Sequence, residues 1–470
     1  MCGIVGIADT EGVSFPLYYA LFALQHRGQE SAGISTFDAG KLHNHKAQGL
    51  IAEVFNRDIL SRLTGSVGIG HVRYPTTGEN RPENNQPLNF SFKGHVFSIV
   101  HNGNLVNSHI LSSEYEDEGH IFATTTDTEV IAAIIARELT RSGSMEEAIN
   151  LCMQKLQGSY SVIAMLDGTI YAFRDPLGIK PLCIGKTDNG YMVASESVAM
   201  DALGANFMRD LKPGELIRID SEGISCRQIT RSNNTGLCIF EYIYFARSDS
   251  VIDGVLVYDV RKKIGEMLHK EAPVRAEIIS PVPDSGTAFA TGYSEASGIP
   301  FKEGLIKNRY IGRTFIMPTQ KLRENAVRMK LNPVRGHIKG KSVVLVDDSI
   351  VRGTTSRRII ELVREFGARE VHFRVGSPPI IAPCYLGVDL PTRKELIAHN
   401  RPPDEVRSCI SADSLHHVSL EALIRATGHA PEDLCCGCIT GCYPLEIQGE
   451  RSSCRQIDFV DGTYQTKLEL

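Results

Sequence analysis

The stretch SVVLVDDSIVRGTTS, residues 342–356, indicates the fold of the second half of this 470-residue chain. Residues 342–346 are almost continuously apolar, which is typical of a strand buried on both faces of a parallel sheet. Asp347 and Asp348 stand directly after that strand. Open α/β sheets bind their ligands beyond the carboxyl ends of the strands. The two carboxylates are therefore predicted to line a binding site.

The loop after these aspartates is predicted to bind a phosphate group. It contains a glycine followed by three hydroxyl side chains, and a helical pattern begins there. Backbone N–H groups and hydroxyls at a helix N-terminus form an anion site. Carboxylates above such a site suit sugar hydroxyls and Mg²⁺, which prefers hard oxygen ligands and keeps substrate phosphates in its coordination shell. The residues predicted to form this site are Asp347, Asp348, Gly353, Thr354, Thr355 and Ser356.

Two other interpretations of this stretch are weaker. A nucleoside triphosphatase would need the pattern G-x-x-x-x-G-K-[ST] after a strand. The nearest match, from Gly336 to Ser342, is one residue short and leads into a strand instead. The aspartates could also simply cap the loop after a core strand, but the Gly-Thr-Thr-Ser that follows them makes this less favourable.

The first half of the chain has the pattern of an α+β domain. Short β-branched runs separated by turn residues predict strands, and helical periodicity lies between some of them. The strands are expected over residues 3–7, 67–70 and 161–165, and the helices over 15–24, 128–140 and 144–155.

The second half has the alternating strand and helix patterns of an α/β domain with a parallel sheet. Strand-like runs at 276–281 and 342–346 each lead through a polar loop into a helical pattern. The polar stretch 227–236 is typical of a surface connector, and it places the boundary between Asp220 and Gly236. We therefore expect one domain over residues 1–225 and another over 226–470.

The composition is that of an ordinary globular protein, with 42% hydrophobic and 22% charged residues and a net charge of −5. A net negative chain is not expected to bind nucleic acid or an anionic membrane surface. No apolar run is long enough to span a bilayer, and the N-terminus lacks the pattern of a signal peptide. We therefore expect a cytoplasmic protein whose partners include neither nucleic acid nor a membrane.

The chain opens Met1-Cys2-Gly3, and removal of the initiator methionine would leave Cys2 with a free α-amine. A thiol is a strong nucleophile only as the thiolate, so it needs a nearby base. An α-amino group titrates near about pH 8 and can take the proton locally. Cys2 is therefore a candidate nucleophile, although a small buried residue at the start of a strand would leave the same pattern.

Four further segments carry polar groups that suit amide hydrolysis: QHRGQESAG (25–33), HVRYPTTG (71–78), HNGNL (101–105) and TDTE (126–129), the last opening a helix with an N-cap signature. The reaction needs a cation for the substrate carboxylate, an anion for its amine and donors for an oxyanion. On these motifs, roughly the first 220 residues resemble the class II, N-terminal-nucleophile glutamine amidotransferases. The resemblance assigns Cys2 as nucleophile, Arg73 to the glutamine carboxylate, Asn102 and Gly103 to the oxyanion hole, and Asp127 to the α-amine.

Residues 342–356 resemble the phosphoribosyl pyrophosphate signature of the type I phosphoribosyltransferases. This resemblance adds Ser285, in the loop VPDSG (282–286), as a ligand to Mg²⁺ beside Asp347 and Asp348, or to the pyrophosphate. Between residues 301 and 341 the chain has 11 Lys or Arg against 2 Glu. The segment 309–332 resembles the loop that closes over the substrate in this family, and closure would exclude water.

In this order, the two sets of motifs resemble the amidophosphoribosyltransferases of purine biosynthesis, in their iron–sulfur branch. The resemblance implies an αββα N-terminal-nucleophile glutaminase domain followed by an α/β type I phosphoribosyltransferase domain with a central parallel sheet. Ammonia from glutamine would displace pyrophosphate from phosphoribosyl pyrophosphate, giving 5-phosphoribosylamine with one Mg²⁺ per subunit. A homotetramer or other homo-oligomer and feedback inhibition by purine nucleotides are further implications. Ser248 and Pro75 depart from the family pattern, but neither change removes a group with an assigned role.

Two other functions remain open from the sequence. A class II amidotransferase could pass its ammonia to fructose 6-phosphate or aspartate, but those relatives lack the signature at 347–356. A regulator that senses phosphoribosyl pyrophosphate would bind it without turnover, and an intact Cys2 domain argues against that function.

Twelve cysteines are many for a reducing compartment. Four of them lie within residues 435–442, and Cys435 and Cys438 form a C-x₂-C pair of the kind that binds metals or clusters. The resemblance supplies Cys238 and Cys384 as a distant pair, and so implies one [4Fe–4S] cluster per subunit on these four cysteines. Zinc, or a shifted set that uses Cys436 or Cys442, is also compatible with the spacing.

Overall fold

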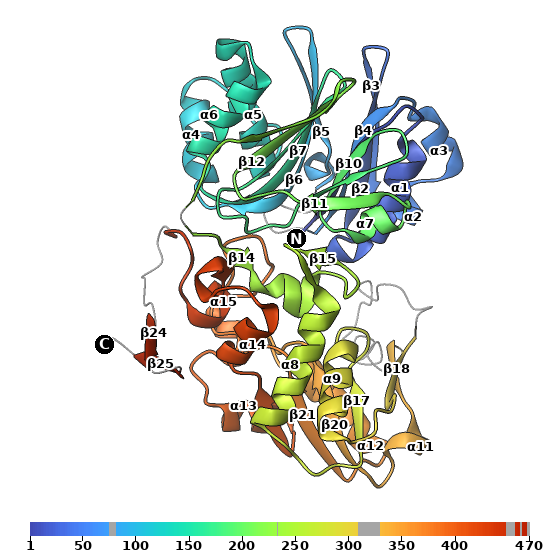
Figure 1. The fold of residues 1–470 in the computed structure, drawn as a ribbon, viewed down its shortest axis with the longest axis vertical. Helices are drawn as coiled ribbons and strands as arrows, with labels where there is room; N and C mark the ends of the chain where they lie inside the picture. Colours follow the sequence, from blue (N-terminus) through green and yellow to red (C-terminus); the bar gives the residue numbers. More distant parts are fainter. Residues whose placement is uncertain (75–80, 233, 309–329, 448–455, 461–462, 468–470) are drawn as a thin grey trace.

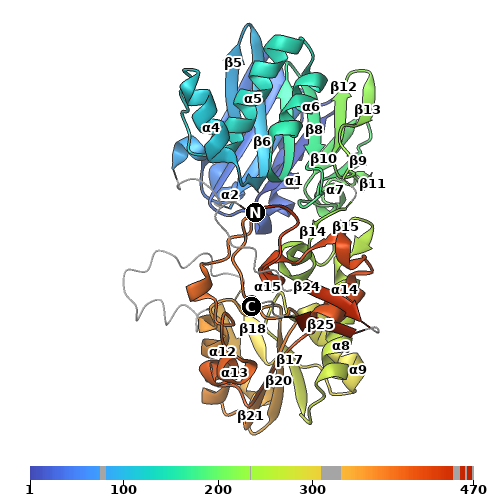
Figure 2. The ribbon, with the colours of Figure 1, turned by 90° about the vertical axis from the view of Figure 1, so that its left-hand side faces the viewer.

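The computed structural model describes the chain except for residues 75–80, 233, 309–329, 448–455, 461–462 and 468–470. The two halves of the chain form two bodies that stack along the long axis (Figure 1). The N-terminus lies at the junction between them, as both views show (Figures 1 and 2). The second residue of the chain is therefore placed where groups from both halves can reach it.

Two antiparallel sheets form the centre of the first body. The strands of the first sheet are β1 (Gly3–Ala8), β2 (Ser31–Asp38), β3 (Lys41–Gln48), β4 (Val67–Arg73), β9 (Cys183–Lys186), β10 (Tyr191–Ala194) and β11 (Asn206–Asp210), in the order β11-β9-β10-β1-β4-β2-β3. Those of the second are β5 (Leu88–Phe92), β6 (His95–Leu105), β7 (Gly158–Leu166), β8 (Thr169–Arg174), β12 (Glu215–Asp220) and β13 (Gly223–Gln228), in the order β13-β12-β8-β7-β6-β5.

Helices cover the outer faces of both sheets, which gives the expected αββα layers (Figure 1). Ile4 and Ile69 of the first sheet pack against Val100 and Ile163 of the second, so apolar residues fill the space between the sheets. The first sheet is covered by α1 (Ser14–Ala23), α2 (Ile51–Val54), α3 (Arg57–Arg62) and α7 (Val198–Asp201). The second is covered by α4 (Ser108–Asp117), α5 (Asp127–Ser142) and α6 (Met145–Lys155).

A parallel sheet forms the centre of the second body, as expected. Its strands are β17 (Ile278–Pro281), β20 (Ser342–Asp347), β21 (Glu370–Val375) and β22 (Ser414–His417), in that order. Every residue of β20 is buried. Val344 and Val346 pack into one apolar cluster and Val343 and Leu345 into another, which explains why the run is apolar at successive positions.

The helices of the second body lie on both faces of this sheet. One face is covered by α8 (Val257–Glu271), α9 (Thr287–Ser297) and α14 (Leu420–Thr427), and the other by α12 (Thr354–Glu365) and α13 (Pro403–Ile410). Shorter elements are β14 (Leu237–Cys238), η3 (Glu241–Phe245), β15 (Val251–Ile252), β16 (Val255–Leu256), β18 (Leu305–Lys307), β19 (Leu331–Pro333), α11 (Arg335–Ile338), β23 (Leu434–Cys435), α15 (Gly437–Thr440), β24 (Gln456–Val460) and β25 (Thr463–Lys467). Single 3₁₀ turns lie at Gln25–Arg27, Pro82–Asn84, Arg393–Glu395 and Pro431–Asp433.

The connector between the bodies begins after β13. This strand pairs with β12 as far as Gln228, so the second sheet continues slightly beyond residue 225. The structured part of the second body begins at β14, which pairs in parallel with β23. Within the described part of the chain, no helix has both the length and the apolar character needed to cross a membrane.

Candidate active sites at the domain junction

Cys2 lies at the start of β1, in the middle of the first sheet, and is 7% exposed. Its backbone N–H donates to Asn102 Oδ1 at 2.9 Å, and its thiol donates to the carbonyl oxygen of Tyr74 at 3.5 Å. Met1 is buried beside it, with its thioether 2.9 Å from the ammonium nitrogen of Lys180. Burial lowers the pKa of the Met1 ammonium group to about 5. The thiol and the backbone nitrogen of Cys2 are thus held together in a dry site.

The other residues predicted to bind glutamine gather around Cys2. Arg73 ends β4 beside β1, and the charges of Cys2, Glu30 and Asp127 oppose the lowering of its pKa by burial. Asp127 accepts a hydrogen bond from the backbone of Leu105 at 2.9 Å. Arg73 is thus a buried cation close enough to Cys2 and to the buried carboxylate of Asp127 for their charges to act on it.

Asn102 and Gly103 lie next to each other on β6, opposite β7. Asn102 holds Cys2 through its amide oxygen, while its side-chain N–H₂ group has no hydrogen-bond partner among the described residues. A Cβ on Gly103 would stand 2.0 Å from the carbonyl oxygen of Ser159, so only glycine fits there. A buried donor without a partner is what an oxyanion hole presents before substrate arrives.

The sequence did not single out His71, although it lies in the motif at 71–78. Both of its ring nitrogens are buried without a hydrogen-bond partner in the described structure, and the same holds for His101 Nε2 and Ser31 Oγ. Burial, and then the charge of Arg73, keeps the pKa of His71 well below its usual value. Ser31 stands opposite Arg73 in the pairing of β2 with β4, and the charges of Arg73 and His101 both act on His71, so these polar residues lie near one another. They form a polar lining that suits a small zwitterion.

The second predicted site lies at the carboxyl end of β20. Asp347 and Asp348 are both buried, and Asp347 accepts a hydrogen bond from the backbone of Asp348 at 3.0 Å. Burial, and then the charge of Asp348, raises the pKa of Asp347 well above its usual value. Two adjacent buried carboxylates are costly without a counter-charge, so this pair fits a divalent cation.

The loop that precedes α9 brings Ser285 towards this pair. β17 and β20 run in parallel, with Pro281 opposite Val346, and Val282 donates to the carbonyl oxygen of Val346 at 2.8 Å. Ser285 is half-buried in the next turn, so the three residues predicted to bind Mg²⁺ lie on neighbouring strand ends. Among the described residues, no three His, Cys, Asp or Glu side chains are arranged to hold a metal ion by themselves.

The predicted phosphate loop precedes α12. Gly353 takes a φ of 76°, and the hydroxyl-bearing residues Thr354 and Thr355 begin the helix with exposed side chains. Ser356 is 4% exposed. A left-handed residue followed by the open N-terminus of a helix forms a concave set of N–H groups, as an anion site requires.

Some predictions fall on other parts of the chain. Pro75 and most of the predicted closing loop, residues 309–329, lie outside the described residues. Ser248, the other departure from the family pattern, accepts a hydrogen bond from Arg261 at 3.0 Å. The N-cap signature is only partly correct: α5 begins at Asp127 as expected, but the side chain of Thr126 makes no capping hydrogen bond.

The cysteines named for the cluster all lie in one apolar region between the C-terminal segment and the start of the second body. Cys238 and Cys435 stand opposite each other in the β14–β23 pair. The carbonyl oxygen of Cys438 accepts hydrogen bonds from Ile381 and Ala382, which brings the loop that carries Cys384 alongside. Burial, and then neighbouring cysteines, raises the pKa of Cys435 and Cys438 well above the usual value. Cys436 lies in the same region, so the alternative ligand set also stays open.

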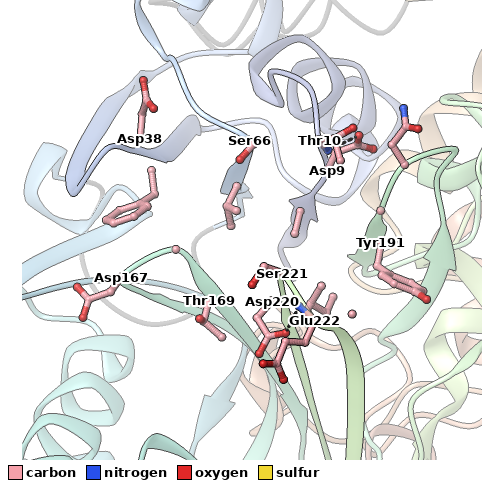
Figure 3. Close-up of a pocket in the computed structure, with 18 of the residues that line it drawn as sticks. Asp9, Thr10, Asp38, Ser66, Asp167, Thr169, Tyr191, Asp220, Ser221 and Glu222 are labelled. Carbon is pink, nitrogen blue, oxygen red and sulfur yellow. Dashed lines mark hydrogen bonds between the residues drawn. The ribbon is translucent and has the colours of Figure 1, made fainter.

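A cavity of about 770 Å³ lies elsewhere in the first body (Figure 3). Carboxylates from different strand ends, including Asp9, Asp38, Asp167 and Asp220, surround it. It adjoins the far end of β1, a strand that spans roughly 20 Å from Cys2. The cavity therefore lies at the opposite end of the sandwich and belongs to neither predicted site.

Both halves match known families. Residues 71–202 match the glutamine amidotransferase domain, and residues 257–375 match the phosphoribosyl transferase domain. The chain is 51% identical to the amidophosphoribosyltransferase of Methanocaldococcus jannaschii, over 96% of this chain and 99% of the relative. It is 47% identical to the Bacillus subtilis enzyme of the same name, over 95% and 94%. The chain belongs to the amidophosphoribosyltransferase family.

A solved structure supports this membership for the whole fold. The glutamine phosphoribosylpyrophosphate amidotransferase of B. subtilis, complexed with ADP and GMP, is 46% identical and superposes with a TM-score of 0.90, over 96% of this chain and 98% of that chain. The chain therefore has the activity of the amidophosphoribosyltransferases, which catalyse the first committed step of purine biosynthesis. A glutamine amidotransferase domain and a phosphoribosyltransferase domain carry out this reaction. The domain match begins at residue 71, so the role of Cys2 has to be argued from the geometry.

Proposed function

We propose that Cys2, with Met1 removed, is the nucleophile that releases ammonia from glutamine. The proposal rests on one observation: the backbone N–H of Cys2 donates to Asn102 Oδ1 at 2.9 Å, while the side-chain nitrogen of Asn102 is buried with no hydrogen-bond partner in the described part of the chain. The backbone nitrogen of Cys2 would become the α-amine and take the thiol proton. Sγ attacks the side-chain amide carbon, and Asn102 and Gly103 stabilise the oxyanion. Ammonia leaves, and water hydrolyses the thioester to glutamate.

In this proposal the two charged residues of the pocket orient glutamine. Arg73 binds the α-carboxylate and Asp127 binds the α-amine, since they are a buried cation and a buried anion near Cys2. Arg73 is held by burial in a single place, which lowers the entropy lost when substrate binds.

The ammonia then attacks C1 of phosphoribosyl pyrophosphate at the end of β20, and pyrophosphate leaves with inversion. Asp347 and Asp348 would bind the ribose hydroxyls, and the loop from Gly353 to Ser356 would bind the 5-phosphate. Mg²⁺, held with the help of Ser285, would neutralise the pyrophosphate charge. The buried carboxylate pair fits this cation because the two carboxylates oppose each other's ionisation, as the raised pKa of Asp347 indicates.

We also propose that Cys238, Cys384, Cys435 and Cys438 hold a [4Fe–4S] cluster with a structural role. Four free cysteines gathered in one buried region are the donor set that such a cluster takes. The group would tie β14 at the domain junction to the C-terminal segment. By analogy with the B. subtilis structure, purine nucleotides are proposed as feedback inhibitors. A cytoplasmic homo-oligomer completes the proposal.

Swapping the nitrogen source tests the two active sites separately. Cys2→Ala should abolish synthesis from glutamine and retain synthesis from high free ammonia. Asp347→Asn and Asp348→Asn should impair both, because both reactions end at the same bound sugar. Cys226→Ala, at an exposed cysteine, is the matched control for the thiol change. Equal loss from both nitrogen sources in a folded Cys2→Ala protein would contradict the division of labour.

Iron analysis tests the cluster. Protein purified without oxygen should be brown and contain about four irons per chain. Cys384→Ser should lose that iron, whereas Cys409→Ser, at an exposed cysteine, should keep it. Colourless protein with one zinc would show that the metal assignment is wrong, and full iron in Cys384→Ser would show that the ligand set is wrong.

A further inference from the structure

Arg27 is a fully buried arginine that contacts the backbone of Cys2. Its Nε donates to the carbonyl oxygen of Cys2 at 3.0 Å, and its side chain has no solvent-exposed surface. It lies in the motif at 25–33, but no role could be predicted for it from that motif. Because the guanidinium group is planar and rigid, the direction of its Nε–H bond is set by whatever holds its other two nitrogens.

Those two nitrogens bind one carboxylate from each body. Nη1 donates to Glu196 of the first body at 2.5 Å. Glu241 of the second body accepts from Nη2 at 2.7 Å and from Nη1 at 3.0 Å. Both carboxylates are buried. Burial by itself would lower the pKa of Arg27, but the charges of Glu241 and Glu196 raise it above its usual value.

Glu241 is itself held firmly in the second body. It opens the π-helical turn η3, and π-helical turns occur frequently at functional sites. Arg261 of α8 donates to the carbonyl oxygen of Tyr242, within this turn, at 2.7 Å and to that of Ala246, directly after it, at 2.8 Å. The second body therefore fixes the position of the Glu241 carboxylate, and this carboxylate orients the guanidinium group of Arg27.

Glu196 makes a second connection across the junction. Its Oε2 accepts from the backbone of Arg247 at 3.0 Å and from the Ser250 hydroxyl at 2.5 Å. The Nε2 of His26, a partly exposed side chain, lies 2.7 Å from the other oxygen. The two terminal nitrogens of Arg27 are thus held by one carboxylate from each body, and the Glu196 carboxylate is itself bound by residues of the second body.

We propose that Arg27 is a positioning residue for Cys2 and that Glu241 of the second domain sets its geometry. Docking of the transferase domain then aligns the glutaminase nucleophile, since a displacement of the Cys2 backbone moves both the thiol and the α-amine. This inference rests on the proposed role of Cys2. A misplacement of about 1 Å at a reacting group can reduce a rate by about a hundredfold, so a modest shift is enough.

Glu241→Gln tests the proposal because it keeps the size of the side chain and removes its charge. The turnover number for synthesis from glutamine should fall about tenfold or more, while the KM for glutamine and the rate from free ammonia stay at wild-type values. Arg27→Lys keeps the charge but cannot bind both carboxylates and the Cys2 carbonyl oxygen at once. It should therefore also lower the turnover number from glutamine and leave the rate from ammonia unchanged. The double variant should be no slower than Arg27→Lys alone, because both changes remove one connected contact.

Glu215→Gln is the matched control, since Glu215 is also buried and paired with both terminal nitrogens of an arginine, Arg209, but within the first body. It should leave both rates unchanged. A direct measurement is the rate at which iodoacetamide alkylates Cys2, which should change in Glu241→Gln and not in the control.

Equal loss with glutamine and with ammonia in Glu241→Gln would overturn the inference, because a general structural role predicts that result. So would a wild-type rate from glutamine. If Glu241→Gln does not fold, the rates from glutamine and from ammonia can be compared in the same way in Arg27→Lys and in Glu241→Asp, which has a shorter side chain. Cys2→Ala separates the two hypotheses. Glutamine turnover in Cys2→Ala would refute the assignment of Cys2 as the nucleophile. Loss of glutamine turnover in Cys2→Ala together with a wild-type rate in Glu241→Gln would refute only the positioning role.

Discussion

Gly353 controls the geometry of the proposed phosphate loop at the scale of one residue. Its φ of 76° is a left-handed conformation that side chains disfavour. A Cβ would stand 2.3 Å from Cδ1 of Ile397, the mobile end of a side chain that packs under the loop. An added methyl group therefore strains the backbone and also displaces the support of the loop.

Gly353→Ala should cost stability and raise the KM for phosphoribosyl pyrophosphate. The backbone conformation costs about 1–2 kcal/mol, which thermal unfolding would show as a lower Tm. Gly298→Ala is the matched control: Gly298 ends α9 with a φ of 72° and open space around it. It should lose similar stability with an unchanged KM. An unchanged KM in Gly353→Ala as well would mean that this loop does not hold the substrate.

The role of a single residue could be predicted from the sequence only where its partners lie in nearby or recognisable segments. Arg73 and Asn102 stand in segments whose composition already indicates a substrate pocket. Arg27 is in such a segment too, but its deciding partner, Glu241, comes 214 residues later. A lone arginine is usually a solvated charge, and no local pattern shows that two distant carboxylates will bury it.

At the scale of elements, the sequence predicted the strands and helices that position both sites. The strand at 342–346 was recognisable because both of its faces are apolar, and the structure confirms it as a central strand of the parallel sheet. The contacts between helices could not be recognised from the sequence. Gly265 of α8 and Gly292 of α9 let these helices approach so closely that a Cβ on either would meet a backbone carbonyl oxygen of the other at 2.0 or 1.9 Å.

Gly292→Ala should therefore destabilise the protein, although alanine is normally the better helix former. The intrinsic gain is about 0.5–1 kcal/mol, whereas forcing two backbones apart costs about 1–3 kcal/mol, so the loss prevails. Because α9 follows the Ser285 loop, activity from both nitrogen sources should fall as well. Gly336→Ala, in α11 with open space around it, should instead leave the Tm unchanged or slightly raised. A higher Tm in Gly292→Ala would show that the helices separate freely.

At the scale of the whole molecule, the order of the motifs predicted two domains but not how they meet. The junction depends on side chains from distant segments. Tyr244 of η3 illustrates this: burial, and then the charges of Asp348 and Tyr74, raises its pKa to about 12, so it lies near residues of both sites. Such a junction depends on three-dimensional packing, for which sequence periodicity carries no signal.

A pair of aspartates, Asp210 and Asp253, also contributes to this junction. Asp253, in the turn between β15 and β16, binds Arg174 through both oxygens at 2.9 and 2.8 Å. Asp210, at the end of β11, accepts from the backbone of Gly254 at 3.3 Å. Burial, and then the charge of Asp253, raises the pKa of Asp210 to about 7, against the opposing charge of Arg174.

Asp210→Asn should stabilise the docked molecule at neutral and higher pH. The folded protein keeps a proton on Asp210 that the unfolded chain releases near about pH 4, so wild-type stability falls as the pH rises from there to about 7. The variant has no such proton, and its advantage in Tm should grow from about pH 4 to pH 7 and then level off. Asp404→Asn is the control, since its side chain is 94% exposed and the change should leave the Tm close to that of the wild type. A constant difference in Asp210→Asn would mean that Asp210 is already ionised throughout, and that Arg174 balances both carboxylates.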